Sequence, residues 1–251
     1  MEILVLLKQT FDTEAKVTVK DGRVVDDDVT LVINPYDEYA VEEALKIREA
    51  AGGTVTVISV GPARVDEALR RALAMGADEA VAIDPPAGAD EVVVASLLAA
   101  WARDKKFDLI LAGNVSVDTG AGQTALRVAE ILGLPHVAAA LKVEIAGDTV
   151  TVHRDAEGDT EVVTVPLPAL ITAQQGLNEP RYPSVPGIMK AKRKQITRLS
   201  PADLGVDAAP KTAVTSVYQA EQNRLNKMIA GTPEEQAREL VRLLRSEAKV
   251  V

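Results

Sequence analysis

The residues best suited to binding chemistry lie between 113 and 124, in the sequence GNVSVDTGAGQT. Its glycines allow close backbone approach to a ligand, and several side chains offer neutral hydrogen-bond donors. The glycines are Gly113, Gly120 and Gly122, and the donors are Ser116, Thr119, Gln123 and Thr124. The spacing is neither that of a P-loop, because no Gly-Lys-Ser/Thr follows, nor G-x-G-x-x-G. The composition nevertheless predicts a phosphate site, with Asp118 as the N-cap of the helix that follows.

Two further loops are expected beside this one. Asn34, Pro35, Tyr36 and Asp37 precede a helical pattern, and a Val60-Gly-Pro sequence follows a strand-like run. Ligands of parallel α/β sheets bind beyond the carboxyl ends of the strands, where loops of this kind meet. Asn34 is a candidate partner for a ribose or a base. Three such loops at one edge predict a nucleotide site.

A second notable loop, QQGLNEPRYP, spans residues 174–183. Pro180 and Pro183 fix φ near −65° and restrict the residues before them. A stiff, exposed loop usually presents side chains to a partner, and Leu177, Arg181 and Tyr182 are the candidates here. The alternative is an ordinary crossover turn with a half-buried leucine.

Composition excludes several classes of function. The net charge of −9 argues against a nucleic-acid surface, and no apolar run reaches membrane-spanning length. The chain has no cysteine, and its two histidines, His136 and His153, lie in different segments without metal-ligand spacing. The N-terminus lacks the features of a signal peptide. We therefore expect a cytoplasmic protein that binds a cofactor or a partner.

Strand-like and helical patterns alternate through the first half of the chain. The apolar runs span 3–7, 54–60, 79–83 and 107–112, and the helical patterns span 37–51, 65–75, 91–105 and 120–132. Continuous apolar strands, each followed by a helix, predict a doubly wound α/β fold with a mainly parallel sheet covered on both faces. A hairpin is expected at 16–25, with its turn at Asp21-Gly22.

The second half differs in character. Four strands are expected at 140–145, 149–153, 161–165 and 169–172, separated by glycine-containing turns. After Pro186 come a basic cluster at 190–194, interpreted as a solvated strand edge or interface flank, and a short turn at 201–205. Thr232-Pro-Glu-Glu predicts the start of a last helix with one narrow apolar stripe. We interpret 1–205 as the α/β domain and 206–251 as an arm that packs on another protein. A helix folded back on its own domain is the alternative.

Longer motifs resemble a known family, the β subunits of electron transfer flavoproteins. The resemblance covers nearly the full length and rests on NPYDEYAVEEA at 34–44, RALAMGAD at 71–78, LNEPRY at 177–182 and IMKAKRK at 188–194. A further signature runs from Val152 through Glu157-Gly-Asp and Pro168 to Thr172. The resemblance implies an adenine-nucleotide-binding, Rossmann-like fold.

The resemblance also implies cofactors. An α subunit would hold a redox-active FAD, while this chain would hold AMP and perform no bond-making chemistry of its own. Many members place a tyrosine near the flavin shortly after the first strand, where this chain offers Phe11 and Thr13, with Thr13 at that position. Relatives that bifurcate electrons bind a second FAD and carry Asp-Gly-Asp-Thr at the phosphate loop, whereas this chain has Asp118-Thr119-Gly120 there. The implied AMP site comprises Leu6, Asn34, Pro35, Tyr36, Asp37, Val60 and the residues 113–124.

The implied partners define the function. The chain would form a heterodimer with the α subunit and shuttle electrons from acyl-CoA dehydrogenases of fatty acid β-oxidation to a membrane quinone oxidoreductase. A recognition loop at 173–182 would dock the dehydrogenases, with Leu177 as its apolar anchor. The docking residues are Gly176, Leu177, Asn178, Glu179, Pro180, Arg181 and Tyr182. The alternatives are a bifurcating β subunit with a second FAD, a stand-alone AMP- or ATP-binding protein, and a purely structural interaction protein.

Overall fold

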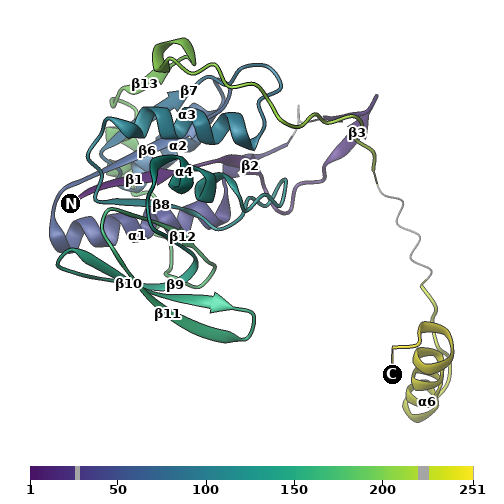
Figure 1. The fold of residues 1–251 in the computed structure, drawn as a ribbon. Coiled ribbons are helices and arrows are strands. Elements are labelled where there is room, and N and C mark those ends of the chain that lie inside the picture. Colours follow the sequence, from purple (N-terminus) through teal and green to yellow (C-terminus); the bar gives the residue numbers. More distant parts are fainter. Residues whose placement is uncertain (26–28, 220–225, 251) are drawn as a thin grey trace.

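The computed structural model describes residues 1–25, 29–219 and 226–250, and within them one nine-stranded sheet forms the centre of the molecule (Figure 1). Its strand order is β11-β10-β9-β12-β8-β1-β6-β7-β13, and every neighbouring pair from β9 to β13 is parallel. The antiparallel strands β10 and β11 extend the sheet at one end. The predicted mainly parallel α/β fold is therefore confirmed.

The strands of this sheet follow the apolar runs of the sequence. They are β1 (Glu2–Leu6), β6 (Thr54–Val60), β7 (Glu79–Ile83), β8 (Leu109–Gly113), β9 (His136–Ala146), β10 (Thr149–Ala156), β11 (Asp159–Pro166), β12 (Ala169–Ala173) and β13 (Ile196–Leu199). Two small antiparallel pairs lie outside it: β2 (Gln9–Phe11) with β5 (Leu31–Ile33), and β3 (Thr18–Lys20) with β4 (Arg23–Val25). The β3–β4 pair is the predicted hairpin, and both Asp21 and Gly22 have positive φ at its turn.

Helices cover both faces of the sheet. They are α1 (Pro35–Ala51), α2 (Val65–Met75), α3 (Glu91–Arg103), α4 (Thr124–Leu132) and α5 (Val185–Ala191), followed by the short 3-10 helix η1 (Ala202–Leu204). Alternate residues of β1 point to opposite faces. Ile3 and Val5 pack with α1 and α2, whereas Leu4 and Leu6 pack with α3 and α4. The apolar strands are thus buried on both faces, as parallel packing requires.

The C-terminal part contains α6 (Pro233–Leu243), which continues into a π-helical turn (Leu244–Ala248). Thr232 caps α6 with the predicted geometry, reinforced by a reciprocal bond from Glu235. None of the residues of α6 is buried, and Figure 1 shows it apart from the sheet, beyond the segment that follows η1. Part of that segment, 220–225, lies outside the described residues. The division of the chain at residue 205 stays a prediction.

Several expected elements differ from the structure. The fourth helix begins at Thr124 rather than at Gly120, because Gly120 has φ +66° and its N–H donates to Ser116 O within a closed loop. The sequence interpretation missed α5 and β13, which are both short. The basic cluster at 190–194 closes α5, and Lys194 Nζ donates to the carbonyls of Ala77 and Asp78. It is a helix end attached to the body, not a strand edge.

Candidate functional site

A cavity of about 290 Å³ lies at the carboxyl ends of the central strands. One wall is apolar, and the opposite side carries hydroxyl groups and the start of a helix. The apolar wall comprises Val60, Ala89, Val94, Leu98, Ala112 and Ala125, and the polar side includes Asn114, Ser116, Thr119 and Thr124. Its size lies near the lower end of the roughly 300–1,000 Å³ that small-molecule sites occupy. An apolar slot beside clustered donors suits a purine ring attached to a phosphate.

Buried Asp37 connects three elements beneath this cavity. Its Oδ2 accepts the Lys8 N–H at 2.7 Å, and its Oδ1 accepts the Gly113 N–H at 2.8 Å, so α1 is tied to the ends of β1 and β8. Burial raises the pKa of Asp37 from 3.8 to about 7, against the opposing effect of these hydrogen bonds. Gly113 is required here because a Cβ would lie 2.3 Å from Asp37 Oδ1.

Asn34 holds the glycine-rich loop rather than facing a ligand. Its Nδ2 donates to Val115 O at 2.9 Å, and its Oδ1 accepts the Val117 N–H at 3.1 Å. The side chain is almost fully buried. The expectation that Asn34 pairs with a ribose or a base is therefore corrected: both ends of its amide already bond the backbone of the loop and give that loop its shape.

The rest of the loop is closed by its own polar groups. Ser116 Oγ and Thr119 Oγ1 lie 2.8 Å apart, and Lys8 Nζ donates to Asp118 Oδ1 at 2.7 Å. Asp118 also accepts the Thr119 N–H, so it is not the helix N-cap that the sequence predicted. An Asp118 cap would have started the helix at Thr119, and the loop continues for five residues beyond that point, to Gln123.

The N-termini of α3 and α4 both lie at the cavity, and they differ in how they are capped. Asp90 caps α3 by accepting the N–H groups of Val92 and Val93, which with further backbone bonds lowers its pKa to about 2. The first turn of α4 has neither a side-chain cap nor an acidic residue, and Gln123 at its N-cap instead accepts from Arg127. The uncapped N–H groups and the positive end of the helix dipole therefore favour an anion at Thr124 and Ala125.

The structure brings together part of the predicted nucleotide set. The predicted residues that line the cavity are Asp37, Val60, Gly113, Ser116, Thr119, Gly122 and Thr124. Those that do not line it are Leu6, Asn34, Pro35, Tyr36, Asp118, Gly120 and Gln123. Sequence reasoning missed eight of the lining residues: Lys8, Ala89, Asp90, Glu91, Val94, Leu98, Ala112 and Ala125. Lys8 directly follows an apolar strand, and Asp90 directly precedes a helical pattern. Their positions directly after a strand or directly before a helix were therefore the sequence signals that could have placed these two residues at the cavity.

The predicted recognition loop is only partly exposed. Leu177 is half-buried and packs against the core on the α1 side of the sheet. This corrects the expectation of an exposed apolar tip and agrees with the alternative of a half-buried leucine. Tyr182, in contrast, is 89% exposed.

Exposed apolar side chains continue beyond the loop into α5. Val185 is 76% and Met189 54% exposed, and Ile188 is partly exposed between them. Residues 185, 188 and 189 have the i, i+3 and i+4 spacing of one helix face. We call Tyr182, Val185, Ile188 and Met189 the apolar patch. A group of large apolar side chains on the surface marks an interaction site.

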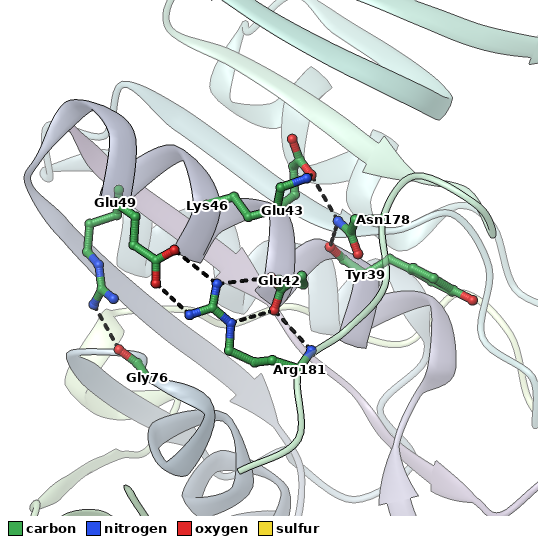
Figure 2. A network of polar contacts seen from close by, with 9 residues as sticks. Tyr39, Glu42, Glu43, Lys46, Glu49, Gly76, Asn178 and Arg181 are labelled. Carbon is green, nitrogen blue, oxygen red and sulfur yellow. Dashed lines mark hydrogen bonds and ion pairs between the residues drawn. The ribbon is translucent and has the colours of Figure 1, made fainter. Parts of the chain in front are cut away.

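A polar network joins the loop to α1 (Figure 2). The Arg181 guanidinium bonds both oxygens of Glu42, at 2.8 and 3.0 Å, and also bonds the carboxylate of Glu49. Asn178 Nδ2 donates to Glu43 Oε2 and to Tyr39 O. The hydrogen bonds to Glu49 and Glu42 raise the pKa of Arg181, and the bond to Arg181 lowers the pKa of Glu49.

No helix among the described residues is both long and apolar enough to cross a membrane. Within the same residues, no cluster of three or more histidine, aspartate or glutamate side chains has an arrangement that could hold a metal ion.

Comparison with known proteins agrees with this architecture. A family model described as "Electron transfer flavoprotein domain" matches residues 21–204. The chain is 48% identical over 260 residues to the electron transfer flavoprotein subunit beta of Bacillus subtilis, covering 100% of both chains. It is 46% identical over 203 residues to that of Syntrophomonas wolfei, covering 80% of this chain and 81% of the relative. It is 38% identical over 257 residues to the human subunit, covering 100% and 99%. The chain therefore belongs to the electron transfer flavoprotein family, as a β subunit.

Proposed function

We propose that this β subunit binds AMP in the cavity at the strand ends and supports electron transfer through an FAD held mainly by its α subunit. FAD supplies the redox chemistry when bound, and this chain supplies assembly and docking. The cavity carries the AMP proposal: its apolar lining residues, including Val60 and Leu98, suit adenine, and the uncapped start of α4 suits the phosphate.

Local donors beside the start of α4 support a nucleoside monophosphate, with the carboxylates of Asp90 and Glu91 also in the lining. Lys8 contributes a cation to the lining, and the Ser116 and Thr119 hydroxyls offer neutral donors. Asp37, with its pKa raised to about 7, is partly protonated at neutral pH and repels a phosphate less than an ordinary carboxylate does. Gly122 keeps the loop backbone open toward the cavity.

The partners follow from family membership and from the surface. As a β subunit, the chain has an electron transfer flavoprotein α subunit as its partner. We propose that acyl-CoA dehydrogenases donate electrons to the pair, that a membrane quinone oxidoreductase accepts them, and that residues 206–251 form an arm on the α subunit. The unburied apolar residues of α6, such as Leu240, support such an arm.

A bifurcating β subunit with a second FAD is the second candidate. A cavity of about 290 Å³ favours a mononucleotide over FAD, which is a dinucleotide. Extraction of cofactors from the co-expressed heterodimer tests this directly. One FAD and one AMP per dimer is the expected result, whereas two FAD and no AMP would move the chain to the bifurcating class.

Docking of dehydrogenases is proposed at residues 176–182 of the recognition loop, together with the apolar patch. The structure favours Val185 over Leu177 as the apolar anchor, because Val185 is exposed and Leu177 packs on the core. Val185→Ala removes about two CH₂ equivalents at about 0.8 kcal/mol each, so we expect the KM for the dehydrogenase to rise about tenfold with the fold intact.

Leu177→Ala is the matched variant for this test. Because its side chain belongs to the packed interior, we expect a loss of stability of about 1–3 kcal/mol and little change in KM. Steady-state transfer with the dehydrogenase as the varied substrate separates the two residues. A raised KM in Leu177→Ala alone would restore Leu177 as the anchor.

A further inference from the structure

We propose that Arg181 is a positioning residue, which fixes the apolar patch in its docking geometry by clamping the chain to α1. The proposal rests on the docking function proposed above. It concerns a residue that does not itself have to touch the partner, because Arg181 directs its guanidinium toward α1 (Figure 2). The next residue, Tyr182, is exposed to solvent.

The clamp is built from rigid parts. Glu42 and Glu49 lie seven residues apart on one face of α1, so they present two carboxylates to a single guanidinium. The Glu42 side chain is only 6% exposed, and it accepts the Arg181 backbone N–H as well as two guanidinium N–H groups. A planar guanidinium bonded to two carboxylates fixes both the position and the orientation of the backbone that carries it. A lysine offers a point charge and cannot reproduce this geometry.

The clamp completes the attachment of α5 to the body. The C-terminal end of α5 is held by Arg70, which donates to the carbonyls of Ala191 and Lys194. Its middle rests on α2, where a Cβ on Gly187 would lie 2.4 Å from Ala74 O. The chain leading into its N-terminal end is held through Arg181. Val185 lies only four residues beyond Arg181. Fixing the chain at both ends of α5 therefore holds the side chains of the apolar patch on a defined backbone.

Fixing the patch before the partner arrives improves docking without new contacts. A binding surface that is competent only part of the time binds more weakly in proportion to its competent fraction. If loss of the clamp leaves about one tenth of the molecules competent, the KM for the dehydrogenase rises about tenfold. The turnover at saturating dehydrogenase stays unchanged, because the flavin and the nucleotide cavity are not touched.

The test compares Arg181→Gln with Arg198→Gln in the assembled heterodimer. Arg198 is the matched control, because it also joins two carboxylates, Asp66 and Asp84, but it lies in β13, after α5 in the chain, and its ion pairs involve neither the loop nor α1. For each variant we would measure KM and kcat for an acyl-CoA dehydrogenase, and hydrogen exchange of the peptides covering 176–191. Arg181→Lys and Glu49→Gln complete the series, the latter removing only the more exposed half of the clamp.

We expect Arg181→Gln to raise KM about tenfold at unchanged kcat, and to speed exchange across 176–191. Arg181→Lys should rescue little, Glu49→Gln should show a smaller change in the same direction, and Arg198→Gln should leave KM unchanged. If Arg181→Gln does not assemble, Glu49→Gln alone carries the test. Unchanged KM and exchange in the clamp variants, while Val185→Ala raises KM, would overturn the positioning role and leave the docking surface standing. Unchanged KM in Val185→Ala as well would overturn the docking proposal itself.

Discussion

Replacing Gly113 with alanine should displace the first turn of α1 from the central sheet, beside the cavity at the strand ends. The added Cβ would lie 2.3 Å from Asp37 Oδ1, 2.7 Å from Tyr36 Cβ and 2.8 Å from the Asp37 backbone N. Because two of these atoms cannot rotate away, the first turn of α1 must shift. Overpacking of this kind costs about 1–3 kcal/mol. The hydrogen bond from Gly113 N–H to the Asp37 carboxylate is worth about 1.5–3 kcal/mol when lost.

The two effects share one contact and do not add fully, so we expect a loss of about 3 kcal/mol. For a chain of this size that lowers Tm by roughly 6–12 °C. Urea unfolding of the isolated chain, followed by the fluorescence of its single tryptophan, Trp101, would measure the change.

Gly120→Ala is the control for this measurement. Gly120 has φ +66° with no atom within 4 Å of an added Cβ, so its substitution costs only conformational strain, about 1–2 kcal/mol. A Gly113→Ala variant no less stable than Gly120→Ala would refute the close approach of β8 and α1, and with it the role given to Asp37.

Two further predictions concern the same cavity. The carboxyl of Asp37 keeps its proton in the folded chain up to about pH 7 but loses it near 3.8 when unfolded, so its contribution to stability is greatest below 3.8 and declines as pH rises to about 7. Between pH 3.8 and about 7, the free energy of unfolding of the parent protein should therefore fall relative to that of Asp37→Asn. If the difference between the two proteins does not change with pH, the raised pKa is contradicted. Gly122→Val places a branched side chain at the cavity, where a Cβ already lies 3.2 Å from Asn114 O, and we expect substoichiometric AMP in the purified heterodimer. A variant with full AMP content would show that the nucleotide lies elsewhere.

Much of the fold follows from local sequence signals. The buried strands of the parallel sheet read as continuous apolar runs, and the limits of α2 and β6 match the sequence pattern because Gly76 and Gly61 end them. Thr232 and Pro233 define the start of α6 by local hydrogen bonding alone. Such signals involve neighbours a few residues apart, so they can be recognised without knowledge of the fold.

The candidate site was predictable only in outline. The strand-end rule located the cavity edge, and Gly122 and Thr124 line it as expected. The roles of Asn34 and Asp118 were assigned wrongly, because their bonding partners, Val115 and Lys8, are distant in the sequence. Polar side chains bond whichever group the fold brings near them, and sequence spacing does not reveal that group.

The sequence by itself determined the layered α/β architecture, the position of the glycine-rich loop after β8 and the family of the chain. Only the tertiary structure decided which apolar side chains are presented to a partner. Leu177 stands in a polar, proline-containing loop, yet it packs on the core, whereas Val185 is left exposed on α5. The physical reason is that the burial of a side chain depends on which other residues pack against it in the folded chain. Here hydrogen bonds between Arg181 and α1, formed across more than 130 residues of sequence, hold the chain between Leu177 and Val185.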